Sequence, residues 1–440
     1  MPRILEQKIS VLIFIYLLII FGYIFSRGFY FTPGLAILFL AAVLLFVYQI
    51  KAFYKNVNVD IKNFLGWVLI LLISLTMALY GGLDQTASYW YIHLSRTILI
   101  GGMILAFLYV FDFLKWSFIY KFRFLALLLI AVALRFLMIF SSPSPYIDVY
   151  YIQKIAPKAL LSGINPYSIM YPKLYPETPD VFSYEPAVIL LNMPAVLVTG
   201  DPRYTLVFAE IGTALLLFLM LKKSRFLKGR KSEIAEILPL IFLYNPRSLF
   251  ILEQAWVDPL IIFLITLFTF LLFFLHRKLL SLVIFGVALA TKQYSIFLIP
   301  FLMKGGYLKI RNLIVPLGVF LGFTLPFFIW NSADFLHDVV FYNLLVLPRH
   351  DSLSLNSLLW FYTGFDIPTA IIIVVGSLLL LVLLKFQKKS PSAVFLATAT
   401  FSLSIFLIYK LAFIHYFYFA GSLLLLSIVL LVSEPQRVDG

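Results

Sequence analysis

The sequence predicts an all-α polytopic membrane protein, a bundle of about twelve full transmembrane helices with further broken or re-entrant helices. The first observation is composition: 62% of the 440 residues are hydrophobic, 12% are charged, and the mean hydropathy is +1.01. Soluble domains carry roughly 45–50% apolar and about 25% charged residues. The composition therefore excludes a soluble enzyme, a disordered chain and a nucleic-acid binder.

The second observation is a series of apolar segments near the length of roughly 17–25 residues that crosses a bilayer as a helix. The expected spans are 9–25, 33–50, 64–80, 97–114, 124–140, 204–221, 234–252, 258–275, 312–330, 366–385, 392–409 and 413–432. Two more segments are irregular. Residues 184–200 are interrupted by Pro194, and residues 279–303 are too long for one helix and contain a polar break around Lys292.

The distribution of charge predicts that both termini are cytoplasmic. With that orientation, 23 of the 34 Lys and Arg residues lie on the cytoplasmic side, as the positive-inside rule requires. The net charge of +14 then reflects orientation in an anionic membrane and gives no sign of a nucleic-acid partner. Both irregular segments must enter from the outer side, and broken helices at membrane depth line cavities or are buried in protein. The expected site is therefore extracytoplasmic, at the cell membrane or, in a eukaryote, at the endoplasmic reticulum membrane.

The outer connection 141–183 is rich in proline and tyrosine, which predicts short interfacial helices joined by rigid turns. Asp148 lies in this connection, within an apolar and aromatic run. A carboxylate there could act as a general base that takes a proton from a hydroxyl group. The alternative is a structural N-cap of the following amphipathic stretch.

Other charged residues are expected on the same side. Arg349 and His350 are adjacent in a second outer loop, where they could bind a phosphate or form ordinary salt bridges within the loop. Lys410 and His415 stand among aromatic residues at a third outer junction and could anchor the interface or bind an anion. Arg135 lies inside a span, where it could pair with Glu210 or reach a lipid phosphate.

Five motifs follow one another in an order that resembles a known family. They are Asp148, SGINPY at 162–167, SYEPAVILLNMP at 183–194, LYNPRSLFILEQAWVDPL at 243–260 and ATKQYSIFLIPFL at 290–302. This order resembles the GT-C superfamily of polytopic glycosyltransferases, and most closely the catalytic mannosyltransferase of GPI-anchor synthesis and related enzymes that use polyprenyl-phosphate mannose. The resemblance covers about residues 125–420. It divides the chain into a four-span N-terminal extension, 1–123, a catalytic core, 124–432, and a cytoplasmic tail, 433–440.

The resemblance implies roles for individual residues. The acid of the family's first outer loop falls on Asp148, as general base. Ten further residues with charged, polar or aromatic side chains are candidates for binding the donor phosphate or the rest of the substrate. They are Arg135, Tyr184, Glu185, Asp258, Lys292, Arg349, His350, Asn356, Lys410 and His415. Tyr146 stands where the GPI branch has the first acid of an Asp-x-Asp pair. A divalent metal is therefore doubtful, and no metal ligands are assigned.

The implied activity is inverting transfer of a hexose, most often mannose in this family, from a polyprenyl- or dolichyl-phosphate donor. The acceptor would be a lipid-linked glycan, a glycolipid or a protein. The competing prediction is a polytopic transporter or a flippase of lipid-linked sugars, which would also use broken helices and intramembrane charges. Transporters often have two related halves, and this sequence shows no convincing internal repeat. The chain has no cysteine, so disulfides, thiolate metal sites and cysteine nucleophiles are excluded.

Overall fold

The computed structural model describes residues 2–51, 59–80, 89–110, 118–174, 180–224, 226–227 and 232–433. Within these residues the regular structure is helical, apart from an isolated bridge between Phe29 and Ser352. Ten of the described helices are long and apolar enough to cross a membrane. The predicted multi-pass helical bundle is therefore confirmed. The predicted tail 433–440 lies outside the described residues except for Ser433.

The ten long helices alternate with shorter ones. The long helices are α1 (Arg3–Ile24), α2 (Thr32–Ile50), α3 (Ile61–Leu79), α4 (Tyr89–Val110), α5 (Phe118–Ser141), α8 (Arg203–Lys222), α14 (Ile314–Trp330), α18 (Thr369–Phe386), α19 (Pro391–Ile408) and α20 (Ile414–Ser433). The shorter helices are α6 (Asp148–Leu161), η2 (Pro166–Ser168), α7 (Ala187–Thr199), α9 (Ile234–Leu243), α10 (Ser248–Glu253), α11 (Asp258–Phe273), α12 (Lys278–Leu289), η4 (Gln293–Phe297), α13 (Leu298–Gly305), η5 (Ile310–Leu313), α15 (Ser332–Leu336), η6 (His337–Phe341), α16 (Tyr342–Leu345) and α17 (Leu355–Thr363).

Two of the twelve expected spans are not single long helices. The segment 234–252 divides into α9 and α10 around Pro246, which lacks the N–H that a continuous helix requires. The segment 258–275 forms α11, which has 16 residues and is shorter than the ten long helices. Proline chemistry thus explains the first difference, and the short α11 begins directly at Asp258.

The two irregular segments behave differently from each other. The segment 279–303 is divided, because α12 ends at Leu289 and the 3-10 helix η4 begins only at Gln293. In contrast, α7 continues through Pro194 as one helix, which corrects the expected interruption. One proline removes a single backbone hydrogen bond, and the neighbouring turns of α7 are long enough to keep the helix intact.

The centre of the bundle is α20, with 89% of its most apolar window buried by protein. Helices α1, α8, α11 and α19 pack against it. By contrast, α14 and α18 are each only 17% buried, so their apolar side chains suit contact with lipid. Helices α1 to α4 share one hydrophobic core with the helices that follow residue 123.

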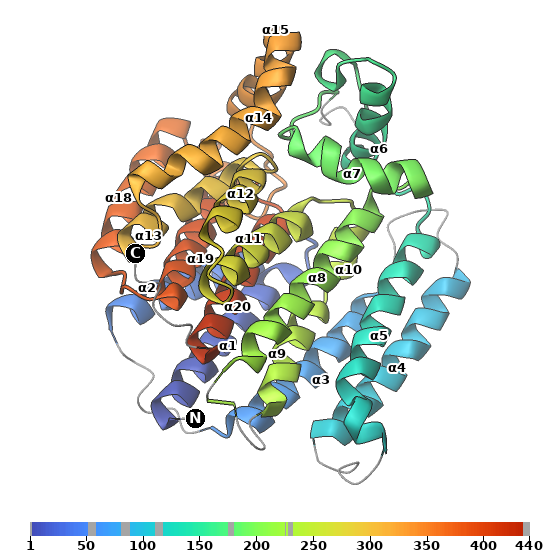
Figure 1. Ribbon diagram of the computed structural model, residues 1–440, viewed down its shortest axis with the longest axis vertical. Helices are drawn as coiled ribbons and strands as arrows, with labels where there is room; N and C mark the ends of the chain where they lie inside the picture. The colour runs from blue at the N-terminus through green and yellow to red at the C-terminus, as the bar shows by residue number, and fades with distance from the viewer. Residues whose placement is uncertain are drawn as a thin grey trace.

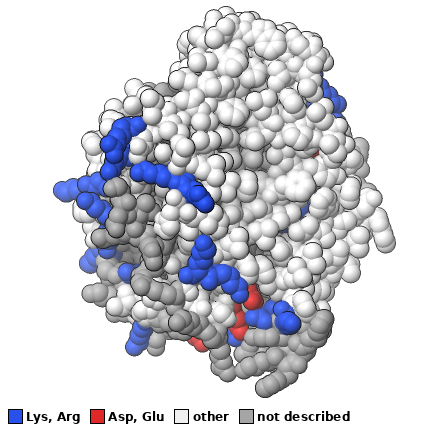
Figure 2. Space-filling model, in the orientation of Figure 1, with Lys and Arg blue, Asp and Glu red and all other residues white. Residues whose placement is uncertain are grey.

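A small cap lies at one end of the bundle. Helices α6, α7 and α15 stand at the end opposite the N-terminus (Figure 1). Ile152 of α6 and Val188 of α7 join Tyr167, Phe182 and Phe335 in a hydrophobic cluster separate from the main core. Figure 2 shows most of the visible Lys and Arg on the left and lower part of the molecule, with a smaller group at the upper right edge. The cap holds the start of α6, and hence Asp148, over the end of the bundle.

Candidate functional site

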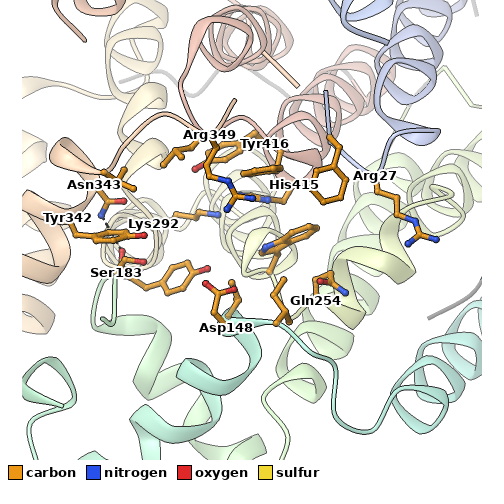
Figure 3. A pocket seen from close by; sticks show the side chains of 18 of the residues that line it. Arg27, Asp148, Ser183, Gln254, Lys292, Tyr342, Asn343, Arg349, His415 and Tyr416 are labelled. Atoms are coloured by element: carbon orange, nitrogen blue, oxygen red, sulfur yellow. Dashed lines mark hydrogen bonds between the residues drawn. The ribbon is translucent and has the colours of Figure 1, made fainter. Parts of the chain in front are cut away.

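A cavity of about 600 Å³ lies between the cap and the bundle. Its wall combines the turn between α1 and α2, the start of α6, the residues before α7, the end of α10, the break after α12, α16 and the start of α20. Four charged side chains from different elements line it: Asp148, Lys292 and Arg349 lie close to one another, and Arg27 stands apart at one side (Figure 3). The cavity thus gathers one carboxylate and several cations at the end of an apolar bundle.

Asp148 is the first residue of α6 and, among the described residues, the one acidic side chain that lines the cavity. The N-cap of α6 is Ile147, whose side chain makes no capping hydrogen bond, so Asp148 is not the N-cap residue that the alternative expected. Burial raises the pKa of Asp148 above its ordinary value, while nearby backbone N–H groups and the charge of Arg349 act in the opposite direction. A partly buried carboxylate with a raised pKa is a stronger base once ionised.

Lys292 enters the cavity from the break between α12 and η4. Its ammonium group lies 2.9 Å from a carboxylate oxygen of Asp258, and Tyr294 donates a hydrogen bond to the other oxygen. The rings of Tyr184, Tyr294 and Tyr416 surround the same ammonium group, with centroids 6.0, 4.8 and 5.5 Å away. Lys292 is thus a nearly buried cation held by one carboxylate and three aromatic faces. Asp258 stands behind Lys292 and does not line the cavity.

Glu185 and His415 are buried beside this group. Glu185 lies just before α7, and one of its carboxylate oxygens has no hydrogen-bond partner among the described residues. His415 lines the cavity with its ring packed between Trp256 and Tyr416, at centroid distances of 4.7 and 4.2 Å. Its Nδ1 is likewise without a hydrogen bond within the described part of the chain. The neighbourhood of Lys292 therefore retains polar capacity that the protein itself does not satisfy.

Arg349 lines the cavity, but its guanidinium group also forms a fork with Asp351, at 2.9 and 2.7 Å. Its neighbour His350 does not line the cavity. The His350 ring stacks on Trp360 at 3.8 Å and its Nε2 lies 3.0 Å from Asp366. Of the two adjacent residues, therefore, only Arg349 is brought to the site.

Three other predicted residues lie away from the cavity wall. Asn356 donates to Asp366 at 2.9 Å and accepts a backbone N–H from Ile367, so it fixes the loop that precedes α18. The Lys410 ammonium donates to the carbonyl groups of Leu344 and Val346. This bond anchors α16, which forms part of the cavity wall.

Arg135 is the third predicted residue that lies away from the cavity wall. Its Nε lies 2.6 Å from Glu210 in a fully buried ion pair between α5 and α8. Its other guanidinium nitrogens donate to the carbonyl groups of Ala131 and Leu243. The structure therefore contains the ion pair that the sequence offered as the alternative, and Arg135 does not reach the cavity.

Several cavity residues escaped the sequence analysis. Arg27 and Phe29 come from the turn between α1 and α2, in the segment that the resemblance left out. Gln254 and Trp256 lie inside a quoted motif, but nothing in their spacing distinguished them. Only the tertiary structure places these residues at the cavity. The turn after α10 is distant from α6 in sequence, yet the Gln153 side-chain amide of α6 donates a hydrogen bond to the Ala255 carbonyl group, 2.6 Å away.

The described residues contain no group of three His, Asp or Glu side chains arranged to hold a metal ion. Comparison of the chain with models of protein families, with curated proteins and with solved structures found no match. The class of the protein is therefore defined by its own architecture: a multi-pass helical membrane protein with a charged cavity at one end of the bundle.

Proposed function

We propose that the protein is an inverting glycosyltransferase that takes a hexose from a polyprenyl- or dolichyl-phosphate donor. The observation that carries the proposal is the placement of Asp148 in one cavity with Lys292 and Arg349. A base is needed on the acceptor side of the reacting carbon, and cations are needed on the side of the leaving phosphate. An apolar bundle also suits a donor whose long tail must stay in the membrane.

In the proposed reaction, Asp148 accepts the proton of the acceptor hydroxyl group. The hydroxyl oxygen forms a bond to the anomeric carbon, while the bond from that carbon to the phosphate oxygen breaks. The electron pair leaves with the lipid phosphate, whose new negative charge Lys292 and Arg349 stabilise. Attack opposite the leaving group inverts the configuration at the anomeric carbon. Because the cations gain most from the charge that develops in the transition state, they accelerate the reaction rather than merely hold the donor.

The position of the cap supports an extracytoplasmic site. Helices α6, α7 and α15 lie at the end of the bundle opposite the N-terminus (Figure 1), and the charge distribution of the sequence favours a cytoplasmic N-terminus. The acceptor in this proposal is a lipid-linked glycan, a glycolipid or a protein presented on that side.

The decisive variant is Asp148→Asn, which keeps the size of the side chain and removes its basicity. With radiolabelled polyprenyl-phosphate mannose in liposomes, transfer to a membrane lipid extract should fall about 10²–10⁴-fold. Asp366→Asn is a matched control, because Asp366 lies outside the cavity and bonds to His350. Undiminished transfer by Asp148→Asn would reject the assignment. A product that is the intact donor moved to the other leaflet, without free polyprenyl phosphate, would identify a flippase instead.

A further inference from the structure

A second polar group occupies the end of the cavity away from Lys292. Figure 3 shows Arg27 and Gln254 on one side, and Lys292, Ser183, Tyr342 and Asn343 on the other, with Asp148 between them. The base therefore lies between two polar regions. Under the proposed function, one of these regions serves the donor phosphate and the other remains unassigned.

Arg27 is a cation without a counter-ion in the described structure. Its guanidinium group packs over the ring of Phe250, 5.9 Å from the centroid, and no described carboxylate forms an ion pair with it. Another cation, Arg247, packs over the same ring at 5.7 Å, so the two positive charges lie close enough to repel each other. An arginine that lines a partly closed cavity without a carboxylate partner favours an anion.

Gln254 provides an independent observation. Its side chain lines the cavity and is 4% exposed, yet no hydrogen bond reaches its amide from the described residues. A buried amide without a protein partner is costly unless a ligand or water satisfies it. The next residue, Ala255, has a left-handed backbone with φ of 55°, and Gln153 of α6 holds its carbonyl group. The turn thus presents the Gln254 amide to the cavity.

The turn that carries Arg27 is also fixed. Arg27 has φ of 56° and Gly28 has φ of 86°, so two left-handed residues in succession reverse the chain. A Cβ atom at Gly28 would lie 2.3 Å from the backbone nitrogen of Ile414, which leaves no space for a larger residue. Arg247 further binds the carbonyl group of Ile24 at the end of α1, 2.8 Å away. These contacts bring α1 and α2 to the cavity wall next to His415.

From these contacts we infer that Arg27 and Gln254 form a second subsite that binds a phosphate group of the acceptor. This inference rests on the proposed glycosyl transfer, because the other end of the cavity is then used by the donor phosphate. The acceptor is accordingly an anionic, phosphate-bearing molecule, either a lipid with a phosphate in its headgroup or a soluble phosphorylated glycan. The neutral amide and the guanidinium group together match the acceptor oxygens of a phosphate.

The first test measures anion binding without catalysis. The full chain in phosphatidylcholine nanodiscs is titrated with dihexanoyl phosphatidic acid and, separately, with inorganic phosphate. Arg27→Gln should weaken binding of the responding probe by about tenfold, Arg27→Lys should restore part of it, and Gln254→Leu should weaken it by about threefold. Arg277→Gln, which alters an exposed arginine at the start of α12, is the control. Binding of phosphatidic acid but not of inorganic phosphate identifies a lipid headgroup as the ligand. Equal binding of both probes identifies a soluble phosphate ligand. Unchanged binding in Arg27→Gln overturns the subsite.

A second measurement assigns the subsite to the acceptor. In the transfer assay, Arg27→Gln should raise the KM for a titrated membrane lipid extract about tenfold and leave the KM for the lipid-linked donor unchanged. A change confined to the donor KM would overturn the assignment. Activity that does not depend on Asp148 would instead count against the proposed function. The loss of anion binding caused by Arg27→Gln in nanodiscs tests the subsite without any transfer reaction.

Discussion

Two buried ion pairs in this molecule, each formed by one cation and one carboxylate, have different surroundings. In the Arg135–Glu210 pair, the arginine also donates to two carbonyl groups, and the Tyr418 hydroxyl lies 3.3 Å from the remaining glutamate oxygen. The pair joins α5, α8 and α20 within the bundle. Its hydrogen-bonding capacity is almost fully used by the protein.

The pair formed by Lys292 and Asp258 lies at the cavity instead. The ammonium group has one carboxylate partner, and its other neighbours are tyrosine rings. Glu185 and His415 nearby each keep a polar atom without a hydrogen bond among the described residues. An ionisable residue inside a membrane protein is often functional. The comparison teaches that nearby polar atoms without hydrogen-bond partners, more than the buried charge itself, distinguish a candidate site from a structural ion pair.

Breaking the structural pair should have the largest effect. Arg135→Ala leaves Glu210 buried without its counter-ion, so the free energy of unfolding should fall by about 3–5 kcal/mol. Urea denaturation in detergent, followed by tryptophan fluorescence, measures the loss. The double variant Arg135→Met with Glu210→Leu should recover most of it, because neither charge remains. An unstable double variant would show that the pair contributes more than compensation of charge.

Changing the cavity pair should affect catalysis more than stability. The double variant Lys292→Met with Asp258→Asn removes both charges and should keep the fold. Its turnover should fall by about 10²–10³-fold, because the leaving phosphate loses a fixed cation. Transfer assays in liposomes measure the rate, and the melting temperature provides the control. Native turnover in this variant would place Lys292 with Arg135 among the structural charges.

The raised pKa of Asp148 predicts a pH dependence that the structural pair does not share. The base acts only when ionised, so kcat/KM should fall about tenfold for each pH unit below the raised pKa. A pH–rate profile should therefore show an acidic limb above the ordinary range of an aspartate. Stability has the opposite sign: because folding favours protonated Asp148, its contribution is complete below the unfolded pKa and is lost as the pH rises through the folded one.

The pH dependence of stability can be tested separately from that of the rate. Asp148→Asn should unfold at a higher temperature than the native chain at neutral pH, and the difference should shrink in acid. A melting temperature that does not change with pH in this way would argue that Asp148 is well solvated.

The smallest effect on turnover is expected from His350, which was predicted to bind substrate but bonds within its own loop instead. His350→Ala removes the contact with Asp366 and the stack on Trp360, which together only shape the loop. Turnover should fall by less than about fivefold, since loop hydrogen bonds of this kind contribute roughly 1 kcal/mol. Parallel kinetics of His350→Ala and Arg349→Ala would separate the two neighbours. A greater loss in His350→Ala than in Arg349→Ala would reverse their assignment.

Some features of the site follow directly from local sequence. Pro246 separates α9 from α10 because it lacks a backbone N–H, although α7 continues through Pro194. The polar residues 291–293 likewise divide a long apolar segment. The membrane class follows from composition for the same reason, because each residue contributes its hydropathy independently of the fold. The position of Asp148 near a helix start was also expected, because an amphipathic stretch follows it.

Other features depended on which helices meet. Arg349 and His350 are neighbours in sequence, yet one lines the cavity and the other packs on Trp360, a choice made by the path of the loop. Arg27 belongs to the cavity because α1 packs against α20. By itself, the sequence determined the membrane bundle and the break around Lys292, since these depend on local chemistry. Only the tertiary structure decided which charges are satisfied, because a hydrogen-bond partner such as Glu210 is supplied by another helix, 75 residues from Arg135 in sequence.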